Sequence, residues 1–323
     1  MYLVFDIGGT YIKYALIDTN GNISKKNKTP TPDGYEATKE NFLNTLTEIY
    51  KEYKNYSKIE GVAVGLPGQI DVEKGLVYGG GALPYLDMTY LGEELSQRFD
   101  GLNVALENDA KCAALAEAWI GNAKGCKSAV VIVFGTGIGG GIIFDGKVHH
   151  GMDMAAGEVS FWLDSIQMEE LPNIKPIEEL TAREDFMDYP KGLWHNKASV
   201  MYLRKTIARY KGMHYKDVSG EMIYKWAEEG DRYINVLLEN LYLSIAKQLC
   251  NIYVILAPEI ILIGGGISSR PEFLEGVNRY VNQIKNFSRL FKSIKINTCK
   301  YLNDSNMIGA FYNYKQLYLK EEN

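Results

Sequence analysis

The run YLVFDIGGTYIKYALID at residues 2–18 holds the structural unit that decides this fold. Apolar, β-prone residues at Tyr2–Ile7 predict a buried strand, and Gly8-Gly9-Thr10 predicts a tight turn into a return strand over Tyr11–Asp18. Asn20-Gly21 is a strong hairpin signal before a third strand. The stretch therefore predicts an antiparallel β-meander.

The same unit occurs again about half a chain later. Ser128–Phe134 predicts an apolar strand, Gly135-Thr136 predicts a turn, and Asp145-Gly146 predicts a second turn after a return strand. Asp18 follows Gly9 by nine residues, and Asp145 follows Gly135 by ten. This spacing predicts a duplicated meander at the head of each of two domains.

Strands and helices alternate along the rest of the chain, which is typical of an α/β fold. Lys25–Pro32 is polar and contains proline, so we expect a connection there. Strands are predicted at Gly61–Gly65, Asn103–Glu107 and Glu259–Ile263, and helices at Phe42–Tyr53, Asp109–Ile120, Ile234–Leu256 and Met307–Leu319.

Composition and charge exclude several classes of protein. Of the 323 residues, 46% are hydrophobic and 23% charged, which excludes a mainly disordered chain. The net charge of −5 leaves no global basic field for a nucleic acid. The four cysteines form no CxxC pair, so a disulfide framework or a cysteine zinc cluster is not expected. No secretory signal or membrane-spanning run is found, so we expect a soluble, cytoplasmic protein.

Three glycine clusters directly follow apolar strands, at Gly8-Gly9-Thr10, Gly135-Thr136-Gly137 and Gly264-Gly265-Gly266. Backbone amides at such turns can hold phosphate oxygens, and the missing Cβ lets a phosphate approach closely. The alternative is that each cluster is only a tight turn. Together they favour a nucleotide held by two domains. The P-loop pattern is absent, and the first turn leads into a strand instead of the helix that a Rossmann turn requires.

Two groups of carboxylates stand where chemistry is possible, and each has a structural alternative. Asp6, beside the first glycine turn, suits a ligand of Mg²⁺ or its water, or it stabilises its own turn. Asp109, in Glu107-Asn108-Asp109, is placed to cap the following helix or to accept a hydroxyl proton from a bound polyol. Glu158 is either a surface charge or part of a tight site among small residues.

The four histidines show no metal-ligand pattern, because His149 and His150 are adjacent while His195 and His214 stand alone. We therefore expect structural or surface roles for all four.

In this order, the motifs resemble those of the ROK family of sugar kinases and sugar-sensing repressors. The motifs that carry the resemblance are DIGGT at residues 6–10, ENDA at 107–110, GTGIGGG at 135–141, AGE at 156–158 and IGGGI at 263–267. The resemblance implies an actin-like (ribonuclease H-like) ATPase fold with a hinged cleft. The implied domains are a small one, 1–107 plus 305–323, and a large one, 108–304.

The resemblance also implies a role for each matching residue. Asp109 would be the general base on a sugar hydroxyl, usually the 6-OH, and ATP with Mg²⁺ would be the phosphate donor. Asn108, Glu158, Gly68 and Ala82 would contact the sugar. Asp6, acting on magnesium through water, would order the phosphates with Gly8, Gly9 and Thr10. Gly135, Thr136 and Gly137 would hold phosphates, and Gly264, Gly265 and Gly266 would lie near the nucleoside.

Two departures from the usual family pattern bear on zinc and on specificity. Ser160 and Phe161 stand where Gly-His is expected, and no cysteine lies between Cys126 and Cys250, so structural zinc is not expected. Packing, through Phe161 and Trp162, would have to hold the loop that shapes the sugar pocket. The segment at residues 80–85 also differs. These features are similar to the zinc-free β-glucoside kinases of the family.

The expected activity is therefore phosphorylation of a glucose unit, with β-glucosides such as cellobiose first, then glucose, then N-acetylmannosamine. A sugar-sensing repressor is disfavoured because the first phosphate strand starts at Tyr2, which leaves no helix-turn-helix, and because the net charge is acidic. An ATPase that does not transfer phosphate to sugar is a third alternative. The resemblance implies a homodimer, with no nucleic-acid or membrane partner.

Overall fold

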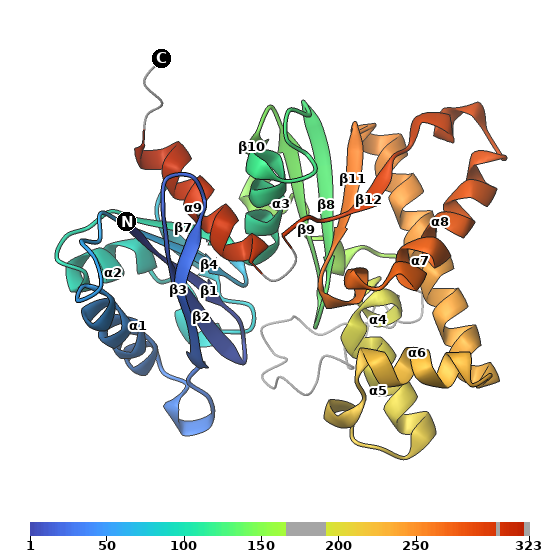
Figure 1. The fold of residues 1–323 in the computed structure, drawn as a ribbon, viewed down its shortest axis with the longest axis horizontal. Coiled ribbons are helices and arrows are strands. Elements are labelled where there is room, and N and C mark those ends of the chain that lie inside the picture. The colour runs from blue at the N-terminus through green and yellow to red at the C-terminus, as the bar shows by residue number, and fades with distance from the viewer. Residues whose placement is uncertain (166–191, 302–303, 320–323) are drawn as a thin grey trace. The chain divides into compact units, whose positions relative to one another are not determined.

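The computed structural model describes residues 1–165, 192–301 and 304–319 (Figure 1). The chain forms two compact units, the first comprising residues 1–127, 141–157 and 303–323 and the second 128–140 and 158–302. The expected domain boundary at residues 107 and 108 stays a prediction, and residues 166–191, 302–303 and 320–323 of those domains lie outside the described residues.

The duplicated meander predicted from the sequence is confirmed by two five-stranded sheets of the same strand order. In the first, β3, β2 and β1 pair antiparallel, and β1, β4 and β7 pair parallel. In the second, β10 and β9 pair antiparallel, and β8, β11 and β12 pair parallel. The orders are β3(Ile23–Pro30)-β2(Tyr11–Ile17)-β1(Tyr2–Ile7)-β4(Val62–Leu66)-β7(Val104–Asn108) and β10(Lys147–Val148)-β9(Ile138–Phe144)-β8(Ser128–Phe134)-β11(Ile260–Gly264)-β12(Ile296–Thr298).

The register of the first sheet places the ends of its parallel strands in one row. Asp6 on β1 lies opposite Gly65 on β4, and Gly65 lies opposite Glu107 on β7. Because carboxyl ends of parallel strands meet at one edge, the first glycine turn and the Glu107-Asn108-Asp109 motif leave the sheet at the same edge. All six residues of β1 are buried, as expected for a strand with neighbours on both sides.

The sequence pattern missed some strands. The expected connection from Lys25 is wrong, because β3 continues to Pro30 as a lysine-rich, largely exposed edge strand paired with β2. A run of charged residues in the sequence is typical of a loop. At the edge of a sheet, the same residues protect the strand from pairing with other chains. The hairpin of β5(Gln69–Asp71) and β6(Leu76–Gly79) was also missed, as was β12.

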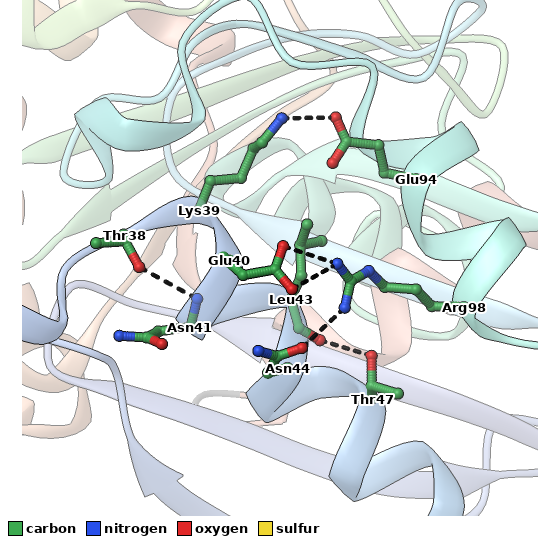
Figure 2. A network of polar contacts seen from close by, with 9 residues as sticks. All are labelled: Thr38, Lys39, Glu40, Asn41, Leu43, Asn44, Thr47, Glu94 and Arg98. Atoms are coloured by element: carbon green, nitrogen blue, oxygen red, sulfur yellow. Dashed lines mark hydrogen bonds and ion pairs between the residues drawn. The ribbon is translucent and has the colours of Figure 1, made fainter.

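One apolar core of the first unit lies between the sheet and the helices α1(Lys39–Tyr53) and α2(Leu91–Arg98). The helices α3(Asp109–Ile120) and α9(Ser305–Tyr318) also contact strands of this sheet. Figure 2 shows Arg98 of α2 reaching two side chains of α1. Its guanidinium donates to both carboxylate oxygens of Glu40, at 3.0 and 2.9 Å, and to Asn44 Oδ1 at 2.9 Å. Lys39 and Glu94 form a second ion pair, at 2.8 Å. These polar contacts fix how α2 lies along α1.

The C-terminal helix α9 packs against α3 and the strands of the first sheet (Figure 1). The two helix backbones approach so closely at Gly309 that a Cβ there would lie 1.7 Å from the Cys112 carbonyl oxygen. Asn313 donates from Nδ2 to the Leu106 carbonyl oxygen on β7, at 3.0 Å. The last helix therefore determines where α3, and with it Asp109, stands on the sheet.

The second unit has its own core around Trp194, which is fully buried. Its helices are α4(His195–Ala198), α5(Val200–Lys211), α6(Gly220–Glu228), α7(Arg232–Leu256) and α8(Pro271–Lys285). The apolar face of α7 is buried in this core. Among the described residues, the structure has no helix that combines the length and apolar character needed to span a membrane.

We predict that Gly309→Ala lowers the free energy of unfolding by about 3 kcal/mol, because α9 has to move away from α3 to admit the methyl group. Gly220→Ala in α6 is the control, since a Cβ there meets nothing within 4 Å. We expect it to change stability by less than about 1 kcal/mol. Urea unfolding measures both variants, and similar losses in the two would contradict the close contact.

Candidate functional site

Asp6 at the end of β1 is a buried carboxylate with two partners. Its Oδ2 forms an ion pair with Lys13 Nζ at 2.7 Å, and its Oδ1 accepts a hydrogen bond from Asn306 Nδ2 at 2.9 Å. Lys13 lies opposite Asp6 in the β1–β2 register, and Asn306 belongs to α9. Because both oxygens are held, the carboxylate points in one direction.

The first glycine turn is a tight hairpin, as its structural alternative predicted. The Gly8 N–H donates to the Tyr11 carbonyl oxygen at 2.9 Å. Thr31 holds the turn from outside, donating its hydroxyl to the Gly8 carbonyl at 2.7 Å and its N–H to the Thr10 carbonyl at 3.0 Å. Thr10 is exposed. The turn is partly exposed beside the Asp6 carboxylate, so phosphate binding to it stays a prediction.

The helix cap predicted for Asp109 is wrong, because Asn108 is the residue that caps α3. Asn108 Oδ1 accepts from the N–H groups of Ala110 and Lys111, at 3.0 and 3.1 Å. Asp109 is instead the first residue of the helix, and its Oδ1 accepts from the Ala110 N–H at 2.8 Å. The helix dipole favours the charged form of a carboxylate at this position.

Asn108 and Ala82, two residues of the first unit that are predicted to contact the sugar, both lie beside Gly68. Asn108 Nδ2 donates a hydrogen bond to the Gly68 carbonyl oxygen at 3.0 Å. The side-chain amide has a second N–H, which this bond does not use. Gly68 has a φ of +103°, and a Cβ added to Gly81 would lie 3.2 Å from its Cα. Ala82 follows Gly81 in the same turn, so the turn at residues 80–83 packs on Gly68.

Negative charge gathers around the first turn of α3. Burial, and then the charges of Glu107, Asp109 and Asp6, raise the pKa of the Cys112 thiol well above its usual value. A divalent cation would be attracted to such a region. Among the described residues, no three His, Cys, Asp or Glu side chains form a metal-binding group. Mg²⁺ suits this set, because it keeps several waters and needs only one or two carboxylates beside phosphates.

In the second unit, two glycine turns lie side by side. Gly265 has a φ of +91°, and a Cβ there would lie 2.0 Å from the carbonyl oxygen of Phe134. Phe134 directly precedes Gly135. The turn after β8 is closed by the Gly135 N–H on the Gly137 carbonyl at 2.9 Å. A Cβ on Gly135 or on Gly266 would meet nothing within 4 Å. Both turns therefore offer open backbone at the ends of neighbouring strands.

The segment that begins at Glu158 is fastened to these turns through Ser160. Its hydroxyl donates to the Ile138 carbonyl oxygen at 2.6 Å and accepts from the Ile138 N–H at 3.0 Å. The expected packing role of Phe161 is wrong, because its side chain is half exposed. Trp162 has that role instead: its carbonyl accepts from the Trp194 N–H at 2.9 Å, and the two rings meet edge to face.

His195 lies beside the second glycine turn, and its ring would be 3.7 Å from a Cβ on Gly137. Burial, with a smaller contribution from the positive charge of Lys205, lowers the pKa of His195 to about 4. The imidazole is therefore neutral at physiological pH, which agrees with the structural role expected for it.

Sequence reasoning missed Lys13, Asn306 and Thr31. Lys13 left a signal, since it is a cation within an otherwise apolar strand. Asn306 left none, because it lies 300 residues from its partner.

The predicted site residues thus form two groups, one in each unit. The first group comprises Asp6, Gly8, Gly9, Thr10, Gly68, Ala82, Asn108 and Asp109, and the second Gly135, Thr136, Gly137, Glu158, Gly264, Gly265 and Gly266.

A family model described as ROK family matches residues 2–172 and 190–317. A β-glucoside kinase from Listeria innocua is 30% identical over 321 residues, which are 99% of this chain and 97% of the relative. An N-acetyl-D-glucosamine kinase from Escherichia coli is 30% identical over 278 residues, 84% of this chain and 86% of the relative.

A solved structure of a ROK family protein from Streptococcus pneumoniae, in complex with sucrose, has a TM-score of 0.79 at 28% identity. The match covers 97% of this chain and 98% of that one. Agreement with structures of this family confirms the expected actin-like α/β fold class.

We predict that His195 makes stability depend on pH. The unfolded chain binds a proton on this imidazole near pH 6.5, whereas the folded chain resists protonation until about pH 4, so acid favours unfolding in this window. Between pH 7.5 and 4.5 we expect the native protein to lose roughly 2–3 kcal/mol more than His195→Gln in urea unfolding. The control, His149→Gln, replaces an exposed histidine and should lose as much as the native chain. Equal losses in all three would contradict the lowered pKa.

Proposed function

Because this chain belongs to the ROK family and is a carbohydrate kinase, we propose that it transfers the γ-phosphate of ATP to the 6-hydroxyl of a glucose unit, with β-glucosides such as cellobiose as its preferred acceptors. The observation that carries this proposal is Asp109, an ionisable carboxylate on the first residue of α3, beside Asn108 and the Gly68 turn.

Asp109 is the proposed general base. As the sugar oxygen attacks phosphorus, its proton passes to the Asp109 carboxylate, a new P–O bond forms, and the bond from the γ-phosphorus to the bridging oxygen of ADP breaks. The second N–H of Asn108 and the carboxylate of Glu158 would hold hydroxyls of the ring. Positioning supplies much of the rate in phosphoryl transfer, so the rigid cap at Asn108 supports this role.

The phosphates would lie on the turns at Gly8–Thr10 and Gly135–Gly137, with Asp6 ordering magnesium through water, and the Gly264–Gly266 turn would lie near the nucleoside. Magnesium, when bound, neutralises charge on the phosphates. Lys13 supports this arrangement because it holds Asp6 in place, and its half-exposed ammonium is a second cation beside the first turn. In the second unit, the open backbone at Gly135 and Gly266 supports binding of the nucleotide.

Three observations favour a glucoside that carries a second sugar over a monosaccharide acceptor, and the first of them points to the β linkage. The β-glucoside kinase from Listeria matches nearly the full chain, whereas the N-acetyl-D-glucosamine kinase matches 84% of it. The Streptococcus protein holds sucrose, a disaccharide. Ala82, on the turn against Gly68, has a small side chain, which is compatible with a second sugar beyond the anomeric carbon. N-acetylglucosamine, glucose and N-acetylmannosamine are the competing acceptors.

A coupled assay of ADP release over cellobiose, glucose, N-acetylglucosamine and N-acetylmannosamine tests the acceptor. We expect the highest kcat/KM for cellobiose. Ala82→Leu should lower kcat/KM for cellobiose about tenfold, because the larger side chain takes space that the second sugar needs, and leave glucose within about threefold. A native preference for N-acetylglucosamine would replace the β-glucoside assignment, and ADP release indifferent to every sugar would identify an ATPase.

We predict that Asp109→Asn keeps sugar affinity and loses turnover by about 10²–10⁴-fold, since the amide keeps the shape but cannot accept the proton. Calorimetry with the sugar and the ADP assay measure the two effects separately. Asp145→Asn, in the exposed turn after β9, is the control and should behave as the native chain. An Asp109→Asn variant with near-native rate would remove Asp109 from the mechanism.

We further propose that the protein is a cytoplasmic homodimer without structural zinc. The family resemblance implies the dimer, and the lack of any cysteine between Cys126 and Cys250 argues against a zinc site. Sedimentation velocity measures the oligomeric state, and elemental analysis of the purified protein measures zinc.

A further inference from the structure

Glu107, the residue before the Asn108-Asp109 pair, is a buried carboxylate whose two oxygens have different partners. Its side chain is 1% exposed. Oε1 accepts a hydrogen bond from the backbone N–H of Asn108 at 2.8 Å. Oε2 lies 2.9 Å from His150 Nε2. The carboxylate therefore joins the end of β7 to a residue 43 positions further along the chain.

His150 is also held through its backbone. Its carbonyl oxygen accepts from the Ala156 N–H at 2.9 Å and closes a compact turn. Gly151, inside this turn, has a φ of +69°, and a Cβ there would lie 2.9 Å from the Ala156 Cβ. Ala156 precedes Glu158 by two residues. One histidine thus touches the strand that ends at Asn108 and the turn that leads to Glu158.

A buried carboxylate is costly unless its oxygens are paired, so Glu107 keeps its position only while His150 supplies the second partner. When that partner is removed, Oε2 is left unpaired in buried surroundings, so the carboxylate rotates and its hydrogen bond to the Asn108 N–H changes with it. Asn108 caps α3 and holds Gly68. A disturbance at Glu107 is therefore passed to the residues proposed to contact the sugar.

We propose that His150 is a positioning residue for the acceptor sugar, holding Glu107 beneath the Asn108-Asp109 pair and fixing the turn before Glu158. The inference rests on the proposed roles of Asn108, Asp109 and Glu158. A merely structural pair would affect both substrates alike. A positioning pair acts on the sugar, because the nucleotide is assigned to the glycine turns.

Calorimetric titration of the full chain tests this, with cellobiose and glucose as sugar probes and ATP with magnesium as the nucleotide probe. His150→Ala should weaken binding of both sugars about tenfold and leave ATP affinity within about twofold. His150→Gln should bind sugar within about threefold of the native chain, because its amide can donate to Glu107. His149→Gln, the exposed neighbour, is the matched control and should match the native chain.

Each outcome decides the inference. Native sugar affinity in His150→Ala overturns it, and so does equal weakening of sugar and ATP, or failure of His150→Gln to restore binding. If His150→Ala does not fold, His150→Met fills the space without a donor and carries the same expectation. Failure of the proposed function gives a different result: the native chain binds neither sugar, or Asp109→Asn keeps the native rate. In either case the inference about His150 is overturned as well. When Asp109→Asn is inactive but His150→Ala binds sugar normally, only the inference is overturned.

Discussion

The contact between Gly309 and the backbone of Cys112 is the constraint on which the first unit depends. Because glycine has no Cβ, α9 lies directly on α3, and the chain's last helix becomes part of the fold that its first strand began. From this position Asn306 reaches Asp6, and Asn313 reaches the Leu106 carbonyl in the middle of β7. The close approach thus sets the place of both carboxylate motifs at the edge of the sheet.

Buried charge explains why these motifs are so firmly placed. Asp6 and Glu107 are both nearly inaccessible to water, and each has both of its oxygens hydrogen-bonded or ion-paired. An unpaired carboxylate in such surroundings is unfavourable, so each partner removes freedom from the backbone around it. Asp109, half-buried at the start of α3, follows directly on this ordered segment, and its proposed role as general base needs such a fixed position.

In the second unit, glycines bring the backbones of two turns close together. Gly265 packs on the carbonyl of Phe134, so the turns after β8 and β11 leave their strands side by side. Their tight-turn and phosphate-binding interpretations are compatible, because the same glycines that close the turns leave Gly135 and Gly266 open. The buried His195 lies beside the Gly137 turn and is neutral, so it adds no charge there.

Local patterns in the sequence were enough for the repeated meander, for most strands and helices, and for the start of α3 at Asp109, because these depend on residues a few positions apart. They also carried the family resemblance, since its motifs are short and contiguous. Only the tertiary structure decided that β3 extends to Pro30, through its pairing with β2. It alone also paired Glu107 with His150 and Asp6 with Asn306. These facts depend on contacts between distant segments, and no local pattern in the chain encodes which buried charge will meet which partner.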